Sequence, residues 1–111
     1  MTRGEYKRVD AFTALAEPTR RRILDRLRLK EHTVGDLVDT LALSQPAVSK
    51  HLKVLREAGF VSSRVAAQHR VYRIEVTPFG ELDRWLEPYR QLWTRHLDNL
   101  EEHLDQMEDP S

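Results

Sequence analysis

The spacing of the apolar residues changes twice along this chain, and this limits the folds that the chain can adopt. Up to Gly59 the apolar residues recur every three to four positions, which is the period of a helix. Between residues 61 and 76 they alternate with polar residues on either side of a break at 67–69, a pattern typical of two strands joined by a turn. From residue 79 the helical period returns. We therefore expect a mainly α fold of five or six helices with one small β-hairpin.

Four helices are predicted before the hairpin. The first covers residues 7–16 and the second covers 18–29, with Pro18 in its first turn. Thr33 and Asp36 have the spacing of a capping box at the start of a third helix over 34–41. Ser44 is a good N-cap for a fourth helix, which Gly59 ends. The side chains expected to face inward are Val9, Phe12, Leu15, Ala16, Ile23, Leu24, Leu27, Leu37, Val38, Leu41, Val48, Leu52 and Leu55.

The last helix, predicted over residues 79–107, has more apolar side chains than a domain of this length can cover. Pro88 lies inside it and should kink or restart it. We expect a second copy of the chain to cover the apolar face, with the first helix beside it. Folding of the helix back onto its own domain is the alternative. The residues expected at the dimer interface are Phe12, Leu86, Tyr89, Trp93, Leu97, Leu100 and Leu104.

Length and charge indicate one domain over residues 1–111, made of a body (7–76) and the C-terminal helix (79–107). Residues 1–76 contain 15 Lys and Arg against 9 Asp and Glu, whereas residues 77–111 contain 3 against 9. The zero net charge therefore averages a basic body and an acidic tail, although solvated charge can also segregate by chance. No apolar run suits a membrane span or a signal peptide, so we expect a cytoplasmic location and no membrane partner.

Two short helices with a tight link, followed by a hairpin, form a winged helix-turn-helix. The fourth helix has small or uncharged side chains near its start, which suit close approach to base edges in the major groove, and cations farther along, which suit phosphates. The hairpin would form a basic two-stranded wing on flanking DNA. The expected DNA-binding residues are Ser44, Gln45, Pro46, Ala47, Ser49, Lys50, His51, Lys53, Arg56, Arg64, Gln68, His69 and Arg70. An ordinary amphipathic helix and a hairpin tip that resists edge aggregation are the alternatives.

The segments AFTALAEPTRRRILDRL (11–27), TVGDLVDTLALSQPAVSKHLKVLREAGFV (33–61) and RVYRI (70–74) resemble the ArsR-type winged-helix regulators. The resemblance implies a homodimeric repressor that binds a near-palindromic operator on double-stranded DNA and releases it when a signal changes. It also implies that Ser44, Gln45, Ala47, Ser49, Lys50 and His51 face DNA, together with Arg64, His69 and Arg70 of the wing.

The chain departs from the metal-sensing members of that family, so it resembles a metal-independent branch. It has no cysteine, and His96 and His103 lie about 10 Å apart along a helix, too far to hold one ion within a chain. A metal site shared between subunits remains an alternative. We expect no cofactor, and a small-molecule effector of unknown identity is open.

Two other functional classes are alternatives to a DNA-binding regulator. An enzyme is not expected, because the chain lacks a Gly-rich loop and a cysteine nucleophile, and every pairing of a Ser with a His lies within the helix-turn-helix pattern. A winged helix that serves only for protein–protein contact remains the second alternative. The basic character of the second and fourth helices favours DNA.

Overall fold

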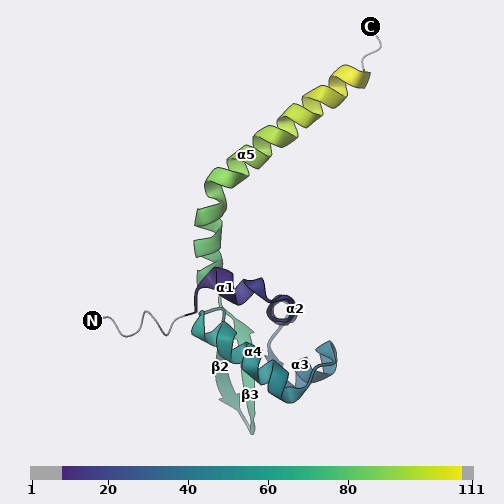
Figure 1. Cartoon of the computed structure of the whole chain (residues 1–111). Helices are drawn as coiled ribbons and strands as arrows, with labels where there is room; N and C mark the ends of the chain where they lie inside the picture. The colour runs from purple at the N-terminus through teal and green to yellow at the C-terminus, as the bar shows by residue number, and fades with distance from the viewer. Residues whose placement is uncertain (1–8, 109–111) are drawn as a thin grey trace, which may run out of the picture. The chain divides into compact units, whose positions relative to one another are not determined.

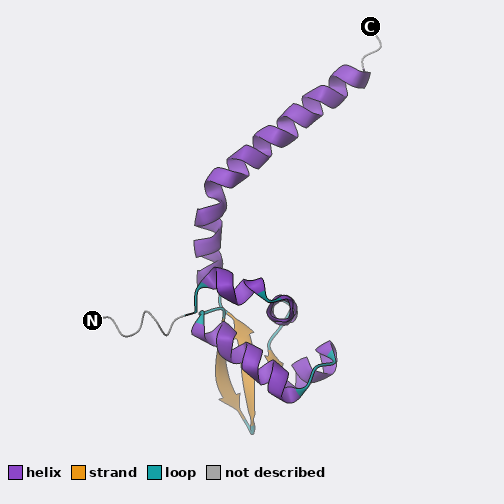
Figure 2. Ribbon diagram, in the orientation of Figure 1, coloured by secondary structure: helices purple, strands orange, loops and turns teal. Residues whose placement is uncertain are grey.

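The structure is a computed structural model that describes residues 9–108, and it confirms the mainly helical fold (Figure 2). The chain divides into two compact units, one ending at Glu81 and the other beginning at Leu82. In the described part, the elements in chain order (Figure 1) are α1 (Ala11–Ala16), α2 (Pro18–Leu27), β1 (His32–Thr33), α3 (Val34–Leu41), α4 (Gln45–Glu57), β2 (Val61–Ala66), β3 (His69–Ile74) and α5 (Thr77–Glu108).

The predicted boundaries of α3 and α4 are confirmed, and the caps explain them. At the start of α3, Thr33 and Asp36 form the expected capping box. At the start of α4, the Ser44 hydroxyl accepts a hydrogen bond from the backbone N–H of Ala47 at 3.2 Å. Gly59 follows α4 with a φ of +84°, the left-handed conformation that glycine adopts at little steric cost.

The sheet has three strands in the order β1-β3-β2, where the sequence predicted two. The additional strand is β1, whose two residues pair antiparallel with Tyr72 and Val71 of β3. A strand this short has no periodicity, so the sequence pattern could not reveal it. The predicted three-residue turn at 67–69 is also wrong, because His69 already pairs with Ala66 and only Ala67 and Gln68 form the turn. Figure 1 shows the hairpin of β2 and β3 ending in a tip that is free of the helices.

The core of the first unit lies where α2, α3 and α4 meet the sheet. Its largest fully buried side chains are Phe60, Ile23, Leu37, Leu52, Leu55 and Val48. The ring of Phe60 meets the ring of Phe79 edge-on, with centroids 5.0 Å apart. The predicted inward stripes of α2 and α4 are therefore confirmed, whereas in α3 Val38 is only half-buried.

The first two helices are shorter than predicted. The Asp10 carboxylate caps α1 by accepting from the Thr13 N–H at 3.4 Å, so the described helix begins at Ala11; Lys7 and Arg8 lie outside the described residues. The inward face predicted for α1 is wrong, because Ala11 and Ala14 are buried while Phe12 is 44% exposed. Helix α2 ends at Leu27 rather than Leu29, which is exposed.

The second unit, considered by itself, is the main part of α5. The helix continues through Pro88, so the predicted restart does not occur. Its apolar face comprises Leu86, Tyr89, Trp93, Leu97, Leu100 and Leu104, which are between 42 and 59% exposed. The rings of Trp85 and Tyr89 lie against each other with centroids 4.8 Å apart. No helix within residues 9–108 is long and apolar enough to span a membrane.

Candidate nucleic-acid interface

Helix α4 has an outer face made of exposed polar and basic side chains. Val48, Leu52 and Leu55 are buried and mark the inner face of the helix. Because the helix turns by about 100° per residue, the side chains opposite that stripe point to solvent. The exposed residues among the predicted set are Gln45, Pro46, Ser49, Lys50, Lys53 and Arg56. Ala47 and His51 are half-buried and do not belong to this face.

The start of α4 and the tip of the hairpin border one hollow of about 430 Å³. Gln45 comes from α4, whereas Gln68, His69 and Arg70 come from the hairpin. The remaining wall is formed by α3 and the residue before it: Thr33, Val34, Gly35, Val38 and Asp39. Predicted site residues that are more than 20 positions apart in sequence therefore share one surface.

The cations of the hairpin differ in their partners. Arg64 Nη2 lies 2.6 Å from a carboxylate oxygen of Glu31, so its charge is already paired. Arg70 donates to the Ser63 hydroxyl at 3.0 Å, and no carboxylate among the described residues pairs with it. Gln68 and His69 are exposed at the turn. Arg70 and His69, rather than Arg64, are therefore the hairpin side chains that remain available for an anion.

The arginines at the start of α2 have structural partners. Arg20 donates from Nε to the Ala14 carbonyl at 2.7 Å and from Nη2 to the Thr13 carbonyl at 3.1 Å. Arg22 donates to the Leu41 carbonyl at the end of α3 at 3.3 Å. These side chains satisfy carbonyls at helix ends, which have no partner within their own helix. Much of the positive charge in this part of the sequence therefore stabilises the fold.

Comparisons with known proteins agree with this geometry. The family described as "Bacterial regulatory protein, arsR family" matches residues 17–63, the segment from α2 into β2. The chain is 41% identical over 95 residues to the HTH-type transcriptional regulator Rv2034 of Mycobacterium tuberculosis, covering 86% of each protein. The chain belongs to the ArsR family.

A second relative and a solved structure extend this assignment. The transcriptional repressor SdpR of Bacillus subtilis is 32% identical over 77 residues, which cover 69% of this chain and 86% of the repressor. An ArsR-like transcriptional regulator from Rhodococcus sp. RHA1 superposes with a TM-score of 0.66 at 27% identity, covering 92% of both chains. The ArsR-family chain is accordingly a winged-helix transcriptional regulator and not an enzyme.

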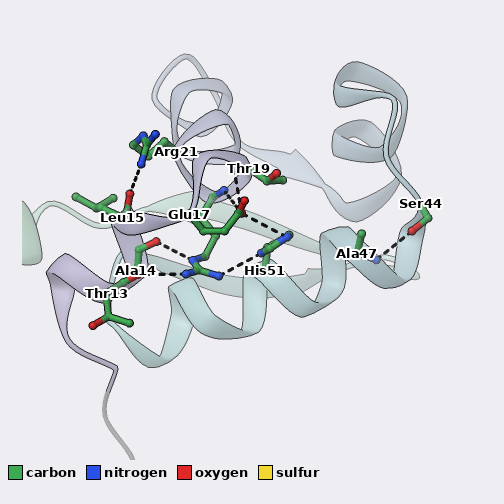
Figure 3. A network of polar contacts seen from close by, with 10 residues as sticks. Thr13, Ala14, Leu15, Glu17, Thr19, Arg21, Ser44, Ala47 and His51 are labelled. Atoms are coloured by element: carbon green, nitrogen blue, oxygen red, sulfur yellow. Dashed lines mark hydrogen bonds and ion pairs between the residues drawn. The ribbon is translucent and has the colours of Figure 1, made fainter.

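Sequence reasoning missed two residues of this ArsR-family protein that contact α4. Glu17 and Arg20 both approach the ring of His51 (Figure 3). Partial burial raises the pKa of the Glu17 carboxyl, but hydrogen bonds from the Thr19 and Arg20 N–H groups, together with the charge of Arg20, outweigh it, so the net shift is downward. The sequence did contain one indication of this contact. His51 lies four residues after Ala47 and three before Val54, beside the buried stripe of α4, which is a position where a polar side chain faces the neighbouring elements.

The residues that could ligate a metal are also placed by the structure. Residues 9–108 contain no group of three or more His, Cys, Asp or Glu side chains that could hold an ion. On α5, the ring of His96 stacks on Trp93 with centroids 5.6 Å apart.

Proposed function

We propose that this protein is a sequence-specific DNA-binding repressor that acts as a homodimer. The observation that supports this most directly is the outer face of α4. Among the described residues, no carboxylate pairs with Lys50, Lys53 or Arg56, although each is exposed. A helix held by an apolar stripe, with unpaired cations opposite, is suited to lie in a major groove between two phosphate backbones.

The residues of α4 divide into two roles in this proposal. Gln45 and Ser49 are near the N-terminal end, where an amide or a hydroxyl can reach base edges. Ser44 caps the helix, and the small side chain of Pro46 allows the first turn to approach the DNA closely. Lys50, Lys53 and Arg56 contact phosphates, which supply affinity without sequence information. Ala47 and His51 are not assigned to DNA.

The wing contributes through the end of the hairpin. His69, Arg70 and Gln68 border the same hollow as Gln45, so they approach the DNA on the same side as α4. We assign Arg70 to a phosphate next to the groove that α4 occupies. Arg64, paired with Glu31, has at most a lesser role.

Dimerisation is assigned to the apolar face of α5, and Phe12 of α1 is assigned to the same dimer interface. Exposed large apolar side chains at spacings of three and four are typical of a helix that packs against another helix. A two-fold dimer places its two recognition helices in successive major grooves, so the operator should be a near-palindrome with half-sites about 34 Å apart. In this proposal residues 7–76 are the DNA-binding body and residues 79–107 the dimerisation helix of one functional domain.

An apolar hollow of about 210 Å³ beside α1 and α2 is the place where a small apolar effector would bind. Its lining includes Leu15, Leu24, Ile74 and Phe79, with Arg21, Asp25 and Arg28 also present.

The experiment that tests the function is selection of bound sites from random duplex DNA by the purified protein. We expect a two-fold symmetric consensus. Affinity for the selected site should fall by roughly 0.9 log unit per log unit of salt for each phosphate contacted. A folded sample that binds no duplex DNA at low ionic strength would contradict the proposal, and an asymmetric consensus would contradict the dimer.

A further inference from the structure

Helix α4 has a half-buried flank between its buried stripe and its outer face. The flank consists of Ala47, His51 and Val54, followed by the C-cap residue Ala58, and these are spaced four, three and four residues apart. Three of these side chains are apolar. His51 is the only one that offers polar atoms to its neighbours, and its side chain is 18% exposed.

Both ring nitrogens of His51 have partners outside α4. The Nε2 atom lies 3.6 Å from a carboxylate oxygen of Glu17, and the Nδ1 atom lies 3.4 Å from Nη1 of Arg20. Because a guanidinium group only donates hydrogen bonds, Nδ1 is the acceptor. The ring proton then sits on Nε2, which faces the Glu17 carboxylate (Figure 3).

Glu17 and Arg20 are themselves fixed to the backbone. The Glu17 carboxylate caps α2 by accepting from the N–H groups of Thr19 at 3.0 Å and Arg20 at 3.3 Å. The Arg20 guanidinium donates to two carbonyls of α1, those of Thr13 and Ala14. The partners of His51 therefore hold one position relative to both α1 and α2.

We propose that Glu17 and Arg20 are positioning residues for DNA binding, which hold His51 and thereby set the rotation and tilt of α4 without touching DNA. Lys50 precedes His51 directly, and Ser49 precedes Lys50, so any rotation at His51 moves both. Side chains that read DNA need placement within about 0.5 Å and 10–20°. This inference rests on the proposed function.

The folded state does not itself require a polar residue at position 51. A leucine would extend an apolar flank. It would leave no buried charge without a partner, because the Glu17 side chain is 36% exposed and Arg20 still donates to the carbonyls of α1. Glu17 and Arg20 would keep their backbone hydrogen bonds. Stability and sequence reading should therefore respond differently to His51→Leu.

The test compares His51→Leu with His51→Gln in the full chain. A glutamine can accept from Arg20 and donate to Glu17, so it should retain selected-site affinity within about threefold. His51→Leu should lower affinity for the selected site about tenfold, comparable to one mismatched base pair. Its affinity for random duplex DNA should stay within about twofold, and its melting temperature should not fall.

Val54→Leu is the matched control, because it enlarges an apolar side chain on the same flank without changing a polar contact. It should leave the ratio of selected-site to random-DNA affinity unchanged. Adding Glu17→Gln to His51→Leu should cause little further loss, because the contact is already broken.

Two results would overturn the inference. One is wild-type selected-site affinity in His51→Leu. The other is a melting temperature that falls together with affinity for both DNAs, which would assign His51 to folding alone. If the wild-type protein itself ignores duplex DNA, the proposed function fails first, and this inference fails with it.

Discussion

At the start of α3, the side chains of Thr33 and Asp36 each accept a hydrogen bond from the backbone N–H of the other residue. The Thr33 N–H donates to the Asp36 carboxylate at 3.0 Å, and the Asp36 N–H donates to the Thr33 hydroxyl at 3.1 Å. Hydrogen bonds from the Thr33 backbone, then from its hydroxyl, lower the pKa of Asp36. This reciprocal pair fixes the first helix of the helix-turn-helix.

The lowered pKa of Asp36 predicts a loss of stability in acid. A carboxyl group whose pKa is lower in the folded state stabilises that state above its unfolded pKa, and the contribution disappears as the pH falls through the folded pKa. Asp36→Asn should therefore show a smaller difference in urea midpoint between pH 7 and pH 3 than the wild type. An equal difference in both proteins would show that Asp36 does not contribute to it.

Ala42, at the end of α3, predicts a stabilising substitution. Its backbone is left-handed, with φ 56° and ψ 45°, a conformation that strains a residue with a Cβ atom. Ala42→Gly should raise the free energy of unfolding by about 0.5–1 kcal/mol, measured by urea denaturation. Ala58→Gly is the control, because Ala58 is right-handed at φ −83° and glycine there should destabilise. Destabilisation by both substitutions would refute the strain at Ala42.

Lys50 and Gln45 should differ in how their loss affects DNA binding. Lys50→Ala removes a phosphate contact, so affinity should fall similarly on the selected site and on random duplex DNA, and the salt slope should decrease by about 1. Gln45→Ala removes a base contact, so mainly the selected-site affinity should fall, by about 1–3 kcal/mol. Fluorescence anisotropy at several salt concentrations measures both. Equal losses on the two DNAs for Gln45→Ala would refute its reading role.

The apolar face of α5 predicts that a charge placed on it separates the subunits. Leu97→Glu would bury an unpaired carboxylate at the dimer interface, which is strongly unfavourable. Sedimentation velocity should then show monomers at concentrations where the wild type is dimeric. Gln91→Glu introduces the same charge on the opposite side of the helix and should leave the dimer intact. A wild-type chain that is monomeric would refute this assignment of α5.

Zinc and chelators should leave operator affinity unchanged, within about twofold. The chain has no thiol, and the ring of His96 stacks on Trp93. If zinc did lower the affinity, and His96→Ala or His103→Ala abolished the effect, a site shared between subunits would replace the metal-independent proposal.

The features predicted well from the sequence are those encoded within a few neighbouring residues. Ser44, the stripe of Val48, Leu52 and Leu55, and Gly59 together predicted α4, since caps and helical spacing are local. The partners of Arg64 and His51 were not predicted, because Glu31 and Glu17 are each more than 30 positions away and charge complementarity alone selects no partner. Phe12 has the spacing expected of an inward-facing residue, yet the buried residues of α1 are Ala11 and Ala14, because spacing alone does not show which face of so short a helix meets the core.

The pairing of β1 with β3 determines which part of the hairpin can move. Tyr72 and Val71 have strand partners on both sides, in β1 and in β2, whereas Arg70 and His69 pair with β2 alone. Bending of the hairpin is therefore confined to the few residues beyond Val71. The anchored base would keep the basic tip in register with α4, while the tip itself could adapt to grooves of different width.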